Sequence, residues 1–217
     1  MEKLNRKSKG LENRLPIKAV QFGEGNFLRA FVDYAFHRLN NEVDFNAGIA
    51  VVQPLKEGMV NMINDQDGLY TLFMNGIKKG EKIQDIQLIS NIVKAINPYS
   101  DFADYLALAK EPALQFIVSN TTEAGIEFLD TDTPDMQPPA AFPAKLTLLL
   151  HERFQHFNGE ASKAVTIIPC ELIDYNSETL KKCILQYCDL WNLDAAFKKW
   201  VSEDCTYHST LVDRIVP

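Results

Sequence analysis

Short apolar segments alternate with longer amphipathic segments along this chain. Residues 17–22 (IKAVQF) and 48–53 (GIAVVQ) are compact apolar runs typical of buried strands. Between them the apolar residues from Phe27 to Leu39 recur at helical spacing. Strands separated by helices must be joined by crossovers, which favours a parallel sheet with helices on both faces. The pattern therefore predicts a doubly wound α/β domain with its ligand site at the carboxyl ends of the strands.

The remaining segments extend this pattern and add one exception. The exception is a β-hairpin, predicted from the runs 69–74 and 83–89 on either side of the turn-rich residues 75–80. Further strands are expected at 114–118 and 165–168, an exposed proline-rich loop at 130–143, and helices at 101–110 (capped by Ser100 or Asp101), 144–157, 177–191 and 194–201.

Charge and cysteine usage limit the partners of the chain. The net charge is -7, which argues against a nucleic-acid partner. No apolar run approaches the roughly 18 residues of a membrane helix, and no secretory signal is evident at the N-terminus. Cys170, Cys183, Cys188 and Cys205 form no C-x-x-C pair, so neither a zinc site nor a disulfide framework is expected. We therefore expect a cytoplasmic protein without a metal, a membrane partner or a nucleic-acid partner.

The turn after the first expected strand, GEGNFLR, carries the main site signal. Gly23 permits a tight turn, and Gly25 lets the backbone approach a diphosphate. Asn26 is expected to cap the following helix, whose N-terminus attracts anions, and Arg29 adds a positive charge. The match to G-x-G-x-x-G is incomplete because Leu28 replaces the third glycine, so a structural turn without a ligand is the alternative.

Polar residues follow the other strands of the predicted sheet. Where dinucleotide sites usually have an acid at the end of the second strand, this chain has Gln53, whose amide could bond to the ribose hydroxyls. The resulting preference for NAD is slight, because Lys56 nearby leaves NADP open. The segment 119–125 (SNTTEAG), including Asn120 and Thr121, is expected either to line a cofactor cleft or to form a plain turn.

The sequence excludes two dehydrogenase chemistries. No tyrosine is followed four residues later by lysine, as short-chain enzymes require, and no clustered Cys/His set could hold a catalytic zinc. Asn176, after the last strand, could donate to a carbonyl oxygen or simply cap the next helix. His37, in the first helix, is expected to be structural or to face solvent.

Five segments together resemble a known family. QFGEGNFLRAF (21–31), VVQP (51–54), SNTTEAGI (119–126), IIPCELIDYN (167–176) and LVDRIVP (211–217) are similar to the mannitol dehydrogenase family, the polyol-specific long-chain dehydrogenases. Within the family the resemblance is nearest to the branch that reduces D-tagaturonate to D-altronate. Fructuronate reductases and mannitol dehydrogenases are the more distant alternatives, because their glycine loops tend to read G-x-G-x-F-H-R where this chain has Phe27-Leu28-Arg29.

The resemblance implies a Rossmann-like, NAD-binding domain over residues 1–217 and zinc-independent reduction of a sugar acid. It implies that Asn176 and Asp213 lie by the nicotinamide and the substrate. Mannitol dehydrogenases carry an asparagine where this chain has Leu172, and Asn176 is expected to replace it. The residues expected to bind the cofactor are Val20, Gln21, Phe22, Gly23, Glu24, Gly25, Asn26, Phe27, Leu28, Arg29, Gln53, Asn120 and Thr121.

Members of the family continue into a helical domain that supplies a catalytic lysine. We therefore expect this chain to be the cofactor-binding half of an oxidoreductase, to be inactive alone and to be capable of self-association. Two alternatives use the same glycine turn: a methyltransferase that binds S-adenosylmethionine, and a nucleotide-binding module without enzymatic activity.

Overall fold

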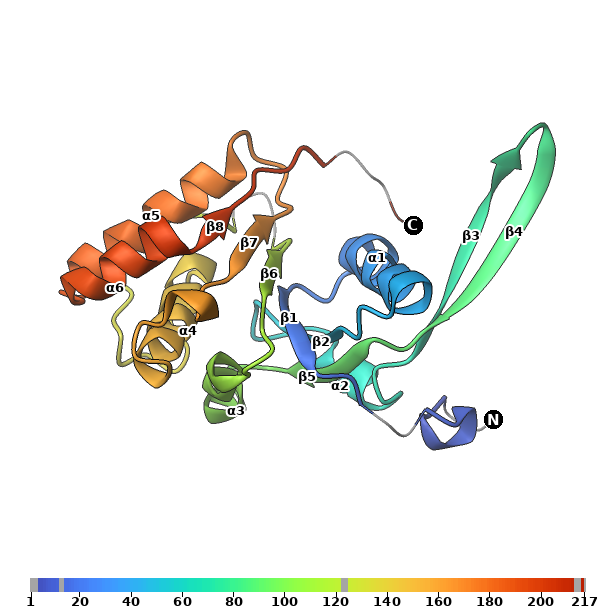
Figure 1. Cartoon of the computed structure of the whole chain (residues 1–217), viewed down its shortest axis with the longest axis horizontal. Coiled ribbons are helices and arrows are strands. Elements are labelled where there is room, and N and C mark those ends of the chain that lie inside the picture. Colours follow the sequence, from blue (N-terminus) through green and yellow to red (C-terminus); the bar gives the residue numbers. More distant parts are fainter. Residues whose placement is uncertain (1–3, 12–13, 122–124, 213–215, 217) are drawn as a thin grey trace.

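Six parallel strands form the central sheet of the computed structural model (Figure 1), which describes residues 4–11, 14–121, 125–212 and 216. The order β5-β2-β1-β6-β7-β8 reverses direction between β1 and β6. This is the strand order of a Rossmann fold, in which a ligand binds where the order reverses. The strands are β1 (Ile17–Phe22), β2 (Gly48–Val52), β5 (Ile92–Ile96), β6 (Phe116–Ser119), β7 (Thr166–Pro169) and β8 (Thr206–Tyr207).

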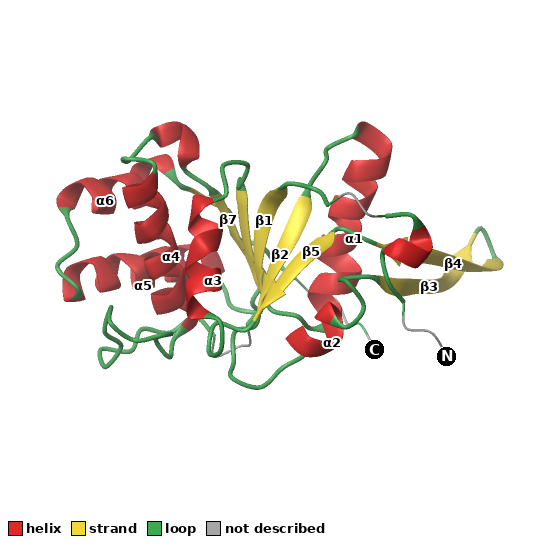
Figure 2. Cartoon of the chain, turned by 90° about the horizontal axis from the view of Figure 1, so that it is seen from below, coloured by secondary structure: helices red, strands yellow, loops and turns green. Residues whose placement is uncertain are grey.

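Helices cover both faces of this sheet (Figure 2). One face is covered by α1 (Asn26–Val43) and α2 (Val60–Asn64). The other carries α3 (Phe102–Ala107), α4 (Phe142–His156), α5 (Asn176–Leu190) and α6 (Ala195–Lys199). Short 3-10 turns lie at Lys7–Lys9, Leu108–Lys110 and Ala161–Lys163, and a π-helical turn spans Trp200–Asp204. The predicted doubly wound α/β fold is confirmed.

Two apolar cores explain why the strands read as continuous apolar runs. Val20 and Phe22 of β1 pack toward α4, where the rings of Phe22 and Phe142 lie 4.9 Å apart. Ala19 faces the opposite core, which Phe36 of α1 and Ile63 of α2 complete. A strand buried on both faces needs apolar residues at successive positions rather than at alternate ones.

The predicted hairpin is present and is longer than expected. Strands β3 (Tyr70–Lys78) and β4 (Glu81–Ile89) pair in antiparallel register up to Lys78 opposite Glu81. The turn is therefore Lys79–Gly80, both at positive φ, and not the whole of residues 75–80. Positive φ at both central positions is the geometry that tight hairpin turns prefer. The hairpin extends away from the body of the molecule (Figure 1).

Several elements were missed or differ from the predictions. Strand β5 was missed because the apolar run of β4 continues into it, with only Ser90 and Asn91 between the two strands. The short elements α2 and β8 carry no recognisable periodicity. The predicted helix 101–110 is α-helical only from Phe102 to Ala107. Asp101, one of the two predicted caps, is its N-cap residue but makes no side-chain cap bond, and its Oδ2 accepts a hydrogen bond from Ser100 Oγ. None of the helices within the described residues has the length and apolar character needed to cross a membrane.

Candidate functional site

The glycine turn lies where the strand order reverses, between the ends of β1 and β6. The Gly23 amide donates to Val52 O at 3.0 Å, and the Asn120 amide donates to Phe22 O at 2.9 Å. Gly23 has φ +124, and a Cβ there would lie 2.7 Å from Asn120 O. Position 23 therefore requires glycine for two local reasons, the backbone conformation and the approach of the β6 loop.

Gly25 differs from Gly23 because nothing in the fold itself requires glycine there. It is the N-cap residue of α1, with φ -69 and ψ 167, which any residue can adopt. A Cβ at this position would meet no atom within 4 Å. The first intrahelical bond of α1 runs from the Arg29 amide to Gly25 O. The bare backbone at Gly25 thus borders open space at a helix N-terminus, which favours an anion.

The prediction that Asn26 caps α1 is wrong. Gly25 is the N-cap residue, and it has no side chain with which to cap the helix. Asn26 is already helical, and its Oδ1 accepts a hydrogen bond from Arg29 Nη2 at 2.6 Å. The Arg29 guanidinium also lies over the Tyr70 ring at 5.5 Å, so this charge is held between the start of α1 and the base of β3.

Several residues of the predicted cofactor loop have side chains that point into the protein interior and not toward a ligand. The side chains of Val20, Phe22 and Leu28 are buried in the apolar cores, so only their backbone could reach a ligand. Gln21 is buried beneath the turn, and its Nε2 donates to Gly23 O at 3.1 Å. Phe27 packs against the Phe31 ring at 5.6 Å between centroids.

The side chain of Gln53 is hydrogen-bonded to the backbone of the loop that follows β2. Its Nε2 donates to Leu55 O at 2.8 Å and to Lys56 O at 2.9 Å. Its Oε1 accepts from the Val60 amide at 3.3 Å, and the residue is only 2% exposed. Both ends of the carboxamide thus hold the loop after β2 in shape. The expectation that Gln53 reaches the ribose hydroxyls conflicts with this arrangement.

A buried acid that sequence reasoning did not select joins the loops after β6 and β7. Glu171 Oε2 accepts from Ser119 Oγ at 3.0 Å, and its Oε1 accepts from both the amide and the hydroxyl of Thr121. Asn120 Nδ2 donates to Cys170 O at 2.6 Å. Burial raises the pKa of the Glu171 carboxyl, whereas the hydrogen bonds from Ser119 and Thr121 lower it and only partly offset the effect of burial. The sequence indicates a role for Glu171 only through its position two residues after a buried strand.

The predicted segment 119–125 is described only in part, because residues 122–124 lie outside the residues that the structure describes.

Asn176 is a structural residue in this fold. It is completely buried, and its Nδ2 donates to Pro169 O and Glu171 O, each at 3.1 Å. The same amide bonds to Thr210, whose backbone amide donates back to Asn176 Oδ1 at 3.1 Å. Because both the amide nitrogen and the oxygen of Asn176 are hydrogen-bonded within the protein, this side chain is not free to hold a substrate oxygen. It does not cap α5 either, because the N-cap residue of that helix is Tyr175.

Asp213, the other predicted catalytic residue, lies outside the described residues.

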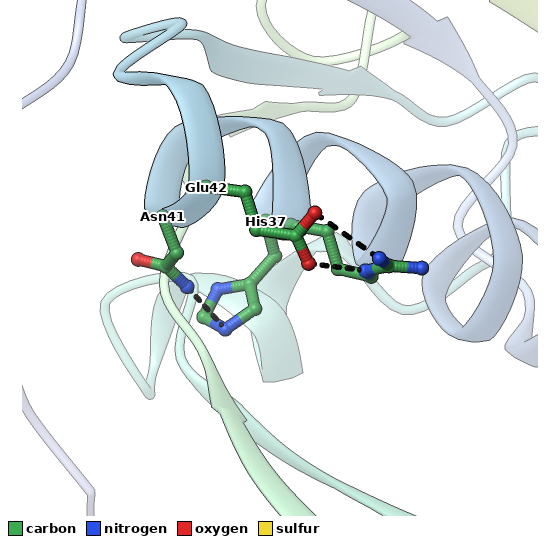
Figure 3. A network of polar contacts seen from close by, with 4 residues as sticks. His37, Asn41 and Glu42 are labelled. Carbon is green, nitrogen blue, oxygen red and sulfur yellow. Dashed lines mark hydrogen bonds and ion pairs between the residues drawn. The ribbon is translucent and has the colours of Figure 1, made fainter.

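His37 belongs to a surface network, in agreement with its expected role. Its Nε2 lies 2.9 Å from Asn41 Nδ2, and Arg38 and Glu42 form an ion pair beside it (Figure 3). It lies eleven residues beyond the start of α1, which places it roughly 16 Å along the helix from the glycine turn. Within the described residues, no group of three or more His, Cys, Asp or Glu could hold a metal ion.

A cavity of about 240 Å³ opens at the carboxyl ends of β2 and β6. Leu55 lines it and is 58% exposed. The other residues around it are Pro54, Thr121, Gly125, Glu127, Ala140, Ala141 and Phe142. Mostly apolar walls with a few polar groups are typical of small-molecule sites.

Sequence comparison identifies relatives over the whole chain. The family model of the mannitol dehydrogenase Rossmann domain matches residues 17–217. Altronate oxidoreductase of Bacteroides thetaiotaomicron is 47% identical over 217 residues, which are 100% of this chain and 45% of that protein. The enzyme of the same name from Yersinia enterocolitica is 50% identical over 202 residues, 93% of this chain and 42% of that protein. This chain thus spans less than half the length of the relatives that it matches.

Solved structures show the same fold at lower sequence identity. Pseudomonas fluorescens mannitol 2-dehydrogenase, in a ternary complex with NAD and D-mannitol, superposes with a TM-score of 0.74 at 20% identity. The match covers 100% of this chain and 48% of that one. A D-sorbitol dehydrogenase in substrate-free form has a TM-score of 0.72 at 20% identity, over 94% of this chain and 46% of that one.

Proposed function

This chain belongs to the mannitol dehydrogenase family, and from that premise we propose that it is the NAD-binding domain of an altronate oxidoreductase. The proposed reaction interconverts D-altronate and D-tagaturonate. In the direction of reduction, NADH supplies a hydride to the keto carbon of tagaturonate and a protonated group supplies the proton to its oxygen. The products are D-altronate and NAD, so two electrons and two hydrogen nuclei are transferred in each turnover.

The open backbone at Gly25 is the observation that carries this proposal. A diphosphate placed there would meet the N-terminus of α1 and the exposed backbone between Gly23 and Gly25. The adenine ring would then enter the cavity beside Leu55, since the glycine turn follows β1 and the cavity lies at the ends of the neighbouring strands β2 and β6. The nicotinamide would extend in the other direction, toward Asn120 and the end of β7.

The proposed role of this chain is to bind and orient the cofactor. Glu171 lies just after the end of β7, and its carboxylate oxygens are occupied by Ser119 and Thr121. The side chain of Asn176 is occupied as well. Among the described residues at this end of the sheet, neither group is placed to exchange a proton with a substrate oxygen. We infer that the proton-transfer group comes from the part of the relatives that this chain does not match. Asp213 remains a predicted substrate-side residue.

Titration of the purified 217-residue chain with NADH tests the proposal. Isothermal titration calorimetry should show saturable binding of NADH, whereas S-adenosylmethionine should give no heat of binding. Mixing the chain with NADH and D-tagaturonate should leave the absorbance of NADH unchanged. Absence of NADH binding would refute the assignment of the cofactor site. Oxidation of NADH that depends on tagaturonate would refute the inference that the proton-transfer group lies elsewhere.

A further inference from the structure

Glu24 is the acid within the proposed diphosphate loop, and the structure turns it toward the loop that follows β2. Its half-buried carboxylate accepts a hydrogen bond from the backbone amide of Met59. A Cβ at Gly58 would collide with Glu24 Oε1 and with the Gln53 carboxamide, so the absence of a side chain at Gly58 leaves room for the acid. Glu24 therefore lies between the glycine turn and the end of β2.

That position is where Rossmann folds hold the ribose of the adenosine half. The acid that grips the ribose hydroxyls usually follows β2 directly. Here that position is Gln53, and its carboxamide is hydrogen-bonded to the backbone of Leu55, Lys56 and Val60. The end of β2 thus lacks its usual acceptor, and a carboxylate from the neighbouring loop approaches the same place.

We propose that Glu24 recognises the adenosine ribose, and that it makes the site select NAD over NADP. This inference rests on the proposed function. A carboxylate can accept hydrogen bonds from the 2′- and 3′-hydroxyls of NAD, and it repels the 2′-phosphate of NADP. Lys56, in the same loop, could otherwise attract that phosphate. Burial raises the pKa of Glu24, while the Met59 amide and the charge of Arg29 favour the ionised form.

Dissociation constants for NADH and NADPH, measured by calorimetry on the whole chain, test the proposal through their ratio. The wild type should bind NADH more tightly than NADPH. Glu24→Gln removes the charge and keeps the shape, and we expect it to lower the preference for NADH at least tenfold. Glu24→Asp keeps the charge and should keep the sign of the preference. Glu57→Gln is the matched control, because Glu57 is an exposed acid in the same loop, and it should leave the ratio unchanged.

Each other outcome has a distinct meaning. If Glu24 only holds the loop in place through the Met59 amide, Glu24→Gln should weaken the binding of NADH and of NADPH by the same factor. An unchanged ratio of the two dissociation constants therefore overturns the inference. A wild-type preference for NADPH, or an effect of Glu57→Gln equal to that of Glu24→Gln, also overturns it. If the wild type binds neither cofactor, the proposed function has failed as well, and that result is separable from a failure of Glu24 alone.

Discussion

Replacing Gly25 by aspartate should stabilise the fold and weaken cofactor binding. The backbone at Gly25 already has N-cap geometry, with φ -69 and ψ 167, and a Cβ would meet no atom within 4 Å. Aspartate is a better N-cap than glycine by a few tenths of a kcal/mol, and replacing glycine restricts the unfolded chain by a further ~0.4–1 kcal/mol. The sum is a gain of about 1 kcal/mol, equivalent to a rise in Tm of roughly 2–4 °C for a domain of this size.

The same substitution places a carboxylate where the diphosphate is proposed to lie. Two unit charges about 4 Å apart repel by roughly 4 kcal/mol at an effective dielectric constant of 20. Since about 1.4 kcal/mol corresponds to a tenfold change in affinity, NADH binding should weaken by up to about 10³-fold. Gly25→Asn is the matched control, because asparagine has the same shape and caps equally well without the charge.

Calorimetric titration with NADH and thermal unfolding of the three proteins provide the measurements. Both variants should melt at or above the wild-type temperature, and Gly25→Asp should bind NADH at least tenfold more weakly than Gly25→Asn. Wild-type affinity in Gly25→Asp would refute the placement of the diphosphate. A large fall in Tm in both variants would instead show that the space at Gly25 is needed by the fold itself.

Three further predictions concern stability, each measured by urea unfolding. Gly23→Ala should cost about 3 kcal/mol or more, because its φ of +124 strains an L-residue and the new Cβ would approach Asn120 O; a loss below about 0.5 kcal/mol would contradict this. Burial raises the pKa of Asp33 to about 7, so the native state holds a proton that the unfolded chain releases near pH 4. Stability should therefore fall as the pH rises from about 4 to 7, by up to roughly 4 kcal/mol, and Asp33→Asn should remove this slope; parallel pH profiles would count against it. Asn176→Ala should cost about 2–4 kcal/mol because it leaves buried partners unsatisfied, whereas the exposed Asn41→Ala should stay within about 0.5 kcal/mol; equal effects would rule out the structural role of Asn176.

Much of the fold could be predicted because its determinants are local in the sequence. The apolar runs of β1 and β2, with the helical spacing between them, are sufficient to predict parallel crossovers. The two glycines at the end of β1 mark the turn for the same reason, since a tight turn and a close approach are properties of a few neighbouring residues. Strand β5 escaped prediction because it follows the hairpin without a clear turn signal, so the local pattern contains no boundary.

The candidate site was less predictable because polar side chains choose partners that are distant in the sequence. Gln53 and Asn176 were expected to face a ligand, yet each satisfies its amide against loop backbone and is buried by it. Glu171 acquires its importance only where it meets Thr121, 50 residues earlier in the chain.

By itself the sequence determined the α/β layers, the protruding hairpin and the glycine turn at the end of the first strand, since periodicity and turn chemistry act over a few residues. The tertiary structure alone decided that strand order reverses between β1 and β6, and that the Glu24 carboxylate of the glycine turn meets the Met59 amide in the loop after β2, beside the Gln53 carboxamide. Both depend on how segments far apart in the chain pack together, because a buried polar group takes whichever hydrogen-bond partner the packing brings within reach.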